Sequence, residues 1–103
     1  MTSGDAKSLG AAVITGFKSK GLQELFDTGR TAKIGPRYHS AAILILDHLD
    51  AATDLKDFTG VKDFHELSGD RRGTYSMHVN GNYCITFKWK PPEVFDVDFE
   101  DYH

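Results

Sequence analysis

Three stretches of the sequence carry side chains that could take part in a reaction. They are residues 64–73, residues 80–87 and the closing residues 100–103, which together supply histidine, tyrosine, carboxylate and arginine. Cleavage of RNA beside a 2′-hydroxyl needs a base for the hydroxyl proton, a cation for the phosphorane oxygens and an acid for the leaving 5′-oxygen. Histidine titrates near neutral pH, and the arginine fork matches phosphate geometry. These groups therefore fit a metal-free cleavage of RNA.

No motif for a cofactor or a metal accompanies these residues. The sequence contains no Walker loop, zinc-ligand spacing, nucleophile elbow or dinucleotide fingerprint. Cys84 is the single cysteine, so it can form neither an intrachain disulfide nor a cysteine-based metal cluster. We therefore expect no metal and no cofactor.

The composition is that of one small globular domain. The 103 residues are 40% hydrophobic and 26% charged, which is ordinary for a soluble domain. The net charge is −3, but residues 91–103 hold acidic residues and no lysine or arginine. The rest of the chain is mildly basic, which leaves room for a local phosphate pocket. The longest apolar run, residues 41–46, is too short for a membrane span, and no secretory signal is visible, so we expect a cytoplasmic protein.

The N-terminal half predicts two helices. Residues 1–12 show no periodic pattern and are interpreted as a flexible lead before one domain at residues 13–103. Residues 13–17 suit a short edge strand, and residues 21–28 suit an amphipathic helix that ends at Gly29. A second helix should begin at Pro36, whose missing N–H is harmless in a first turn. Its buried stripe should consist of Tyr38, Ala42, Ile45, Leu49 and Ala52.

Ile43 and Leu44 fall off that stripe. They lie towards the side of the helix that holds Ser40 and Asp47. Two branched aliphatic residues on a face that should be wetted indicate either a surface for a partner or extra burial beneath a loop. The sequence leaves both interpretations open.

The C-terminal half predicts a sheet. Residues 64–67, 74–79, 83–90 and 94–100 alternate with period two, and their short links require antiparallel neighbours. In the last stretch Phe95, Val97 and Phe99 alternate with acidic residues, as expected of a half-buried strand. The predicted fold class is α+β, with two N-terminal helices packed on one side of a twisted, mainly antiparallel sheet of four to five strands.

The turn at Asn80-Gly81-Asn82 sets the register of the central hairpin. A two-residue loop would place Met77 and Ile85 on opposite faces. A three-residue loop through Asn82, with a positive φ at Gly81 or Asn82, pairs them and gathers the apolar side chains on one face. The opposite, open face would then show Ser76, His78, Cys84, Thr86 and Lys88.

Four stretches carry a resemblance to a known family. They are residues 17–26, Gly69-Asp70-Arg71-Arg72-Gly73, Val79-Asn80-Gly81-Asn82 and the closing Asp101-Tyr102-His103. Over residues 14–103 the sequence resembles the HigB-like branch of the RelE/ParE toxin superfamily, the toxin half of toxin–antitoxin pairs. The resemblance implies a RelE/ParE-like fold and a ribosome-dependent endoribonuclease that cuts mRNA. It also implies a helix-turn-helix, HigA-like antitoxin, for which Ile43 and Leu44 are candidate contacts.

The resemblance also implies which residues act. The catalytic positions would be His65, Asp101, Tyr102 and His103. His65 or His103 would exchange protons, Tyr102 would stack on or orient a base, and Asp101 would fix a histidine tautomer. Apart from the resemblance, Arg71, Arg72 and Lys88 as cations and His78 on the predicted open face are candidates for substrate binding. Each position also has a plainer structural interpretation, such as a surface histidine, an ion pair within a turn or a frayed terminus.

One position departs from the family pattern. Members commonly carry an arginine directly before the Ile-Thr-Phe segment, expected to contact the scissile phosphate, where this chain has Cys84. A thiol is mostly uncharged and cannot replace that arginine. The activity should therefore be reduced, unless Arg71, Arg72 or Lys88 reaches the phosphate. The acidic pI of about 5.9 also lowers the expected affinity for ribosomal RNA.

Two other functions stay open on the sequence alone. One is a non-enzymatic toxin of the gyrase-binding ParE type, which would not need the closing Asp101-Tyr102-His103, so that tail favours the nuclease. The other is a catalytically weakened toxin that acts mainly as antitoxin partner and transcriptional repressor component, which Cys84 supports.

Overall fold

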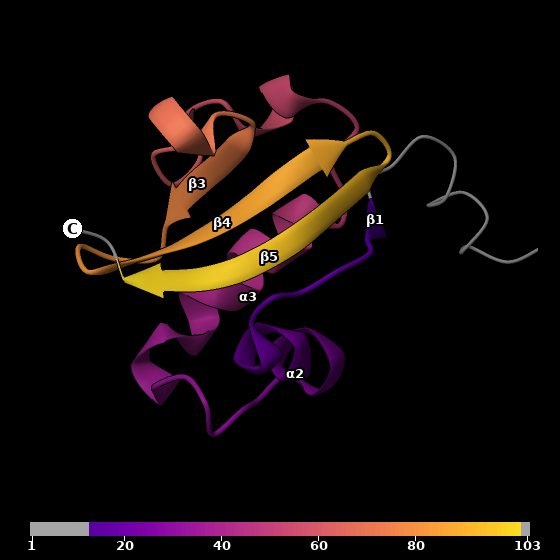
Figure 1. Cartoon of the computed structure of the whole chain (residues 1–103). Helices are drawn as coiled ribbons and strands as arrows, with labels where there is room; N and C mark the ends of the chain where they lie inside the picture. The colour runs from indigo at the N-terminus through magenta and orange to yellow at the C-terminus, as the bar shows by residue number, and fades with distance from the viewer. Residues whose placement is uncertain (1–12, 102–103) are drawn as a thin grey trace, which may run out of the picture.

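A five-stranded sheet forms the centre of the molecule. The computed structural model describes residues 13–101, so the expected lead at 1–12, Tyr102 and His103 lie outside the described residues. The strand order is β1-β5-β4-β3-β2; β1 pairs with β5 in parallel, and the other pairs are antiparallel (Figure 1). The strands are β1 (Val13–Ile14), β2 (His65–Glu66), β3 (Thr74–His78), β4 (Tyr83–Lys90) and β5 (Glu93–Asp101). With two helices on one side, this confirms the predicted α+β class.

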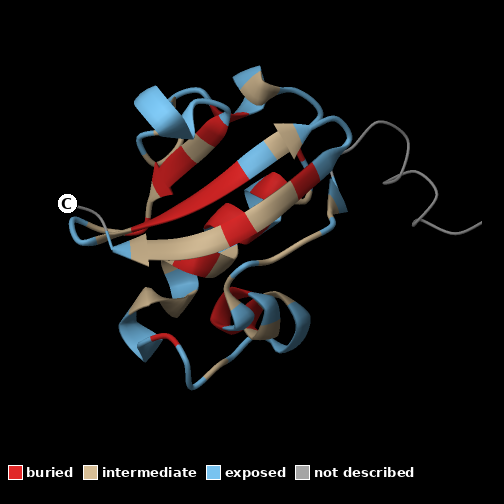
Figure 2. Cartoon of the chain, viewed as in Figure 1, coloured by how far each residue is buried: buried red, intermediate tan, exposed pale blue. Residues whose placement is uncertain are grey.

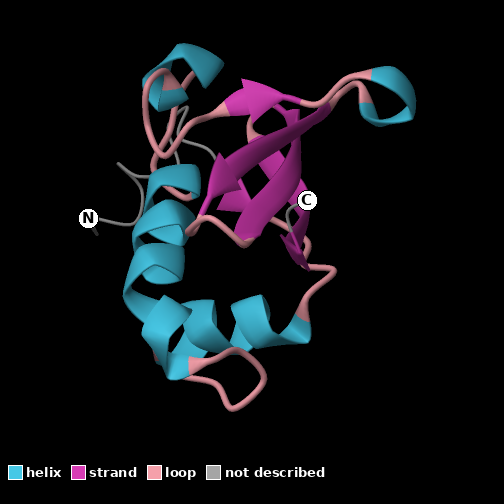
Figure 3. Cartoon of the chain, turned by 90° about the vertical axis from the view of Figure 1, so that its left-hand side faces the viewer, coloured by secondary structure: helices cyan, strands magenta, loops and turns pink. Residues whose placement is uncertain are grey.

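The two helices begin and end where local chemistry dictates. In α2 (Lys20–Thr28) the Ser19 hydroxyl accepts a hydrogen bond from the backbone N–H of Leu22 at 3.1 Å, which is the usual N-cap contact. Gly29 ends the helix in the left-handed region, with φ 86°. The second predicted helix begins at Pro36 as a single 3₁₀ turn, η1 (Pro36–Tyr38), and continues as α3 (His39–Leu49). Figure 3 shows both α-helices on the same side of the sheet.

The hydrophobic core lies between α3 and the sheet. Of the predicted stripe, Ala42, Ile45, Leu49 and Ala52 are buried, whereas Tyr38 at its start is half-buried. Leu46 beside them is also buried. They belong to the same buried cluster as the inward residues of β3 and β4, namely Met77, Ile85 and Phe87. Figure 2 shows the buried residues along α3 and the central strands. Burial of these side chains is what holds the helix layer on the sheet.

The central hairpin has the predicted register but reaches it by different chemistry. Met77 pairs with Ile85, and the N–H of Val79 donates to the carbonyl of Tyr83 at 2.9 Å. The expected positive φ at Gly81 or Asn82 is wrong, because neither residue is in the left-handed region. Instead the side-chain oxygen of Asn80 accepts from the N–H groups of Asn82 and Tyr83, at 2.8 and 2.9 Å. This side-chain bridge closes the turn in place of a glycine conformation.

A β-bulge in β5 changes which residues face the core. The β4–β5 register shifts between Thr86 and Lys88, and Asp96 there has φ 53°. Val94 and Val97 are both fully buried although three residues apart, and Phe95 pairs with Lys88 on the other face. The prediction that Phe95, Val97 and Phe99 share one face is therefore wrong for Phe95. An inserted residue in one strand reverses the alternation on either side of it.

The segment between α3 and the sheet carries one helical turn and places a large aromatic side chain in the core. The turn is η2 (Leu55–Phe58), where Asp54 and Asp57 form a capping box. Phe58 is fully buried, and its ring centroid lies 5.6 Å from that of Phe87 and 5.9 Å from that of Trp89. The loop is thus fixed onto the sheet by edge-to-face aromatic packing.

Candidate active site

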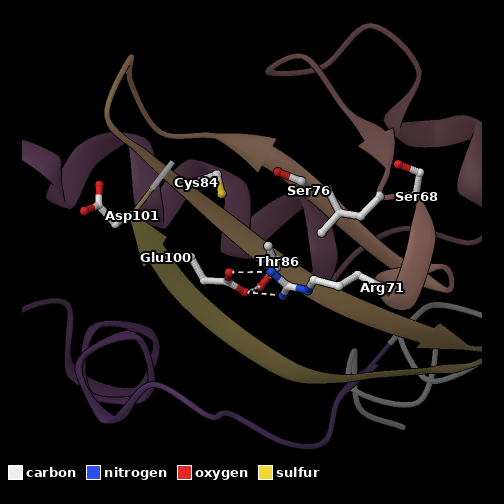
Figure 4. A pocket seen from close by; sticks show the side chains of 8 residues that line it. Ser68, Arg71, Ser76, Cys84, Thr86, Glu100 and Asp101 are labelled. Atoms are coloured by element: carbon white, nitrogen blue, oxygen red, sulfur yellow. Dashed lines mark hydrogen bonds and ion pairs between the residues drawn. The ribbon is translucent and has the colours of Figure 1, made fainter. Parts of the chain in front are cut away.

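A pocket opens on the sheet face that the helices leave uncovered. Its volume is about 280 Å³. The residues that line it come from the segment after β2, from the turn η3 (Gly69–Arg71) and from strands β3, β4 and β5 (Figure 4). The lining residues are Leu67, Ser68, Arg71, Ser76, Cys84, Thr86, Glu100 and Asp101. Ser76, Cys84 and Thr86 were expected on an open face, but all three are buried at the floor of this pocket. The turn and β5 therefore convert a flat sheet surface into a cavity.

An ion pair between Arg71 and Glu100 crosses the pocket (Figure 4). The Nη1 and Nη2 atoms of Arg71 donate to the two carboxylate oxygens of Glu100 at 2.8 and 2.6 Å, a bidentate arrangement that is strong among charged hydrogen bonds. The buried hydroxyl of Thr86 donates to the same carboxylate. The Arg71 hydrogen bonds, aided by Thr86, hold the pKa of Glu100 below its usual range, and Glu100 raises the pKa of Arg71. Both groups are therefore charged at neutral pH.

Cys84 supplies a neutral floor to the pocket. Its side chain is buried, with 4% exposure, and burial raises the pKa of the thiol. It lies next to Glu100, its partner across β4 and β5, and to buried Ser76. A neutral thiol contributes no charge for a phosphate. Among the described residues that line the pocket, Arg71 is the one that carries a positive charge.

His65 lies on the same sheet face, one strand from the pocket floor. It pairs across β2 and β3 with Ser76, and paired residues share a face. Its Nδ1 is 2.8 Å from the backbone carbonyl oxygen of Asp63. A carbonyl can only accept, so Nδ1 carries the proton in this contact, and Nε2 of the neutral ring is left as an acceptor. The ring can therefore take a proton at Nε2 while the backbone holds its orientation.

Comparison with known proteins places the chain in a family. Residues 15–103 match the sequence model of a family described as the RelE-like toxin HigB of type II toxin–antitoxin systems. The chain is also 33% identical over 92 residues to Endoribonuclease HigB of Proteus vulgaris, covering 88% of this chain and all of that protein. This chain belongs to the HigB-like toxin family. The resemblance expected from the sequence is thus confirmed.

Of the closing residues 101–103, the structure describes Asp101, which lies at one end of the site. Asp101 ends β5, is exposed and lines the pocket, whereas Tyr102 and His103 lie outside the described residues. Since Ser76 also lines the pocket and pairs with His65, the pocket lies between His65 and the end of β5. The tautomer of His65 is fixed by the carbonyl of Asp63, so Asp101 is not needed for that task at His65.

Of the four residues predicted to bind substrate, one lines the pocket and three lie outside it. Arg71 lines the pocket, but Arg72 and Lys88 do not. Lys88 Nζ lies 3.8 Å from the carboxylate of Asp96 in the bulge. His78 lies beside His65, with ring centroids 6.1 Å apart, and its Nδ1 is 3.5 Å from a carboxylate oxygen of Asp63. In this HigB-like chain Arg71 thus supplies a positive charge to the pocket, and the neutral side chain of Cys84 does not.

Glu100 and Thr86 belong to this site, although the sequence patterns do not single them out. In the sequence Glu100 is one of several acids on the last strand, and Thr86 is one of several residues on the predicted open face. The available signal was the hairpin register, which places Thr86 on the same face as Cys84. Nothing in the sequence placed Arg71, in a turn 29 residues away from Glu100, over that face.

The two residues proposed for antitoxin binding differ in exposure. Leu44 on α3 is 47% exposed, one of the two large hydrophobic residues exposed among the described residues. Ile43 is half-buried and packs against the core. Leu44 therefore remains a candidate contact for a partner protein, whereas Ile43 mainly packs against the core.

Two general properties complete the description of residues 13–101. No group of three or more histidine, cysteine, aspartate or glutamate side chains there is arranged to hold a metal ion. None of the helices in that range has the length and apolar character that crossing a membrane requires.

Proposed function

We propose that this HigB-like chain is an endoribonuclease that cleaves mRNA on the ribosome and thereby stops growth. The single observation that carries the proposal is that Arg71 lines the pocket and that His65 pairs with Ser76 at the pocket floor, on the same sheet face. The endoribonuclease activity named for the Proteus vulgaris relative supports the same reaction. Because the mRNA that it would cut is held on translating ribosomes, the proposed site of action is the cytoplasm.

The chemistry divides between a proton carrier and a cation. Nε2 of His65 accepts the 2′-hydroxyl proton or returns one to the leaving 5′-oxygen. Arg71 stabilises the charge that develops on the phosphorane oxygens. By family resemblance Asp101, Tyr102 and His103 complete the site, with Tyr102 against a base and His103 as the second proton carrier. Arg72, Lys88 and His78 serve the flanking RNA backbone.

Primer extension on a reporter mRNA tests the reaction and its dependence on translation. The chain is induced beside two reporters, one with its start codon and one without it, and an SOS reporter runs in parallel. We expect cuts at codon boundaries in the translated reporter and none in the untranslated one. DNA damage without cuts would instead support gyrase poisoning, and absence of both would support a weakened toxin kept as an antitoxin partner.

The proposed antitoxin is a small helix-turn-helix protein of the HigA type that binds through α3. The contact residue proposed there is Leu44, a large hydrophobic side chain that is exposed on α3. Co-induction with the neighbouring gene should restore growth and remove the cuts. A neighbouring product that binds the toxin without affecting growth would contradict this assignment.

A further inference from the structure

Glu100 has no assigned role in the site, yet its carboxylate accepts three side-chain hydrogen bonds there. Its carboxylate accepts from two nitrogens of Arg71 and from the hydroxyl of Thr86. The Glu100 side chain is 23% exposed, and Thr86 is almost fully buried. Thr86, Glu100 and Arg71 thus form a chain of contacts from the floor of the pocket to its mouth (Figure 4).

Arg71 keeps free donors while Glu100 holds it. A guanidinium carries five N–H groups, and the bidentate pair uses one on Nη1 and one on Nη2. Three donors remain, including the one on Nε. The Arg71 side chain is also 48% exposed. It can therefore donate to a phosphate oxygen without leaving Glu100.

Glu100 is poorly suited to carry a proton itself. Its pKa is held below the usual range because the ionised form receives the Arg71 and Thr86 hydrogen bonds, so it is a weak base at neutral pH. Both of its oxygens are engaged with Arg71. Any contribution that it makes to the reaction must act through Arg71.

We propose that Glu100 is a positioning residue, which orients the guanidinium of Arg71 to receive the scissile phosphate, and that Thr86 fixes Glu100. This inference rests on the proposed function. A free arginine side chain samples many rotamers and loses that freedom when it binds a phosphate. An arginine that is already held by a carboxylate presents its donors without this entropy cost. The negative charge of Glu100 at the same time repels the RNA backbone. Glu100 therefore weakens binding and accelerates the chemical step.

That combination sets a distinctive expectation for Glu100→Gln. Single-turnover cleavage of mRNA on programmed ribosomes is measured over a range of toxin concentrations, which separates the maximal rate from the half-saturating concentration. We expect the maximal rate to fall by about 10-fold to 100-fold, as for a misplaced catalytic group. The half-saturating concentration should stay equal or decrease. A variant damaged in its fold would lose both rate and binding.

The chain offers a matched control in α2. Glu24 also accepts from a cation and a hydroxyl, with Lys33 Nζ at 2.7 Å and Thr31 Oγ1 at 2.6 Å, and it does not line the pocket. Glu24→Gln removes the same charge from a similar contact and should cleave like the wild type. Thermal unfolding of both variants shows whether either has lost its fold.

A mutant cycle isolates the path through Arg71. Arg71→Lys keeps the charge but loses the fork, so it should slow the maximal rate, and adding Glu100→Gln to it should change nothing further. Thr86→Val should slow the reaction in the same direction, and Thr86→Ser, which keeps the hydroxyl, should lose less. These variants test the idea even if Glu100→Gln fails to fold.

The cleavage measurements distinguish a failure of this inference from a failure of the proposed function. If the wild type cleaves mRNA and Glu100→Gln cleaves equally fast or faster, Glu100 is not a positioning residue and the inference is overturned. The proposed function then stands. If the wild type cleaves no mRNA on ribosomes, the proposed function fails and this inference fails with it.

Discussion

Arg71 and Glu100 are 29 residues apart in the sequence, yet both terminal nitrogens of the guanidinium lie within 2.8 Å of the carboxylate oxygens. The pair joins the η3 turn to the last strand across the floor made by Thr86 and Cys84. It closes one side of the candidate active site. Its stability therefore bears on both the fold and the reaction.

The first prediction concerns the pH dependence of stability. The pKa of Glu100 lies below its usual 4.5 in the folded chain, so its stabilising effect is complete above 4.5 and is lost as the pH falls through the lowered value. At pH 7, Glu100→Gln should lower the free energy of unfolding by about 1 kcal/mol, since the pair is partly exposed. Urea denaturation between pH 7 and pH 3 should show this difference vanish at the acidic end. A difference that grows on acidification would contradict the ion pair.

The second prediction concerns Cys84. An arginine at this position would extend into the pocket and add a second cation beside Arg71. Because one donor to a developing oxyanion is commonly worth 10²–10³ in rate, Cys84→Arg should raise mRNA cleavage by about 10-fold or more. Cys84→Ser, which is small and neutral, serves as the control. Equal rates for a folded Cys84→Arg would mean that Arg71 already meets the need for a cation.

The third prediction concerns the proton carrier. Glutamine at position 65 can still form a hydrogen bond but cannot exchange a proton at neutral pH, so His65→Gln should slow cleavage by about 10²–10⁴-fold. Binding to ribosomes should persist. His48→Gln, at an exposed position on α3, is the control. Wild-type rates in His65→Gln would remove His65 from the mechanism.

The fourth prediction concerns the antitoxin surface. Leu44→Asp places a charge at the exposed hydrophobic of α3 and should weaken antitoxin binding by roughly 10-fold or more, the cost of burying an unpaired charge at an interface. Calorimetric titration measures the affinity, and growth inhibition should be unchanged. Asp47→Asn, an exposed change on the same helix, controls for charge. Unaltered affinity for Leu44→Asp would place the antitoxin elsewhere.

The fifth prediction concerns the fold. Phe58 is fully buried among aromatic rings, so Phe58→Ala should lower the free energy of unfolding by about 3–5 kcal/mol. The loss should appear as a shift of the urea midpoint at constant slope. Leu44→Ala, at a half-exposed site, should cost far less. A small loss at Phe58 would show that the loop contributes little to the core.

The hairpin shows what local patterns predict well. The pairing of Met77 with Ile85 followed from requiring the apolar side chains to share one face. The same reasoning failed one strand later, because the bulge at Asp96 reverses the alternation and carries no clear mark in the sequence. Period-two patterns predict where strands form, but they predict the sheet face of each side chain only where the strand has no bulge.

The candidate site was predictable only in part for the same reason. Arg71 and Asp101 were named from motifs, and both line the pocket. The pairing of Arg71 with Glu100 depends on how a turn folds over the sheet, and that is set by contacts distant in the sequence. Residue types thus indicated the chemistry, whereas the partners of each residue required the three-dimensional arrangement.

The parallel pairing of β1 with β5 has a practical consequence for optical experiments. Val13 lies opposite Glu93, at the other end of β5 from Asp101, and a strand of this length separates the two ends by roughly 25 Å. Val13 is 42% exposed, whereas the single native thiol, Cys84, is buried. A fluorophore attached through Val13→Cys would therefore react selectively and report the proposed ribosome docking without crowding the candidate pocket.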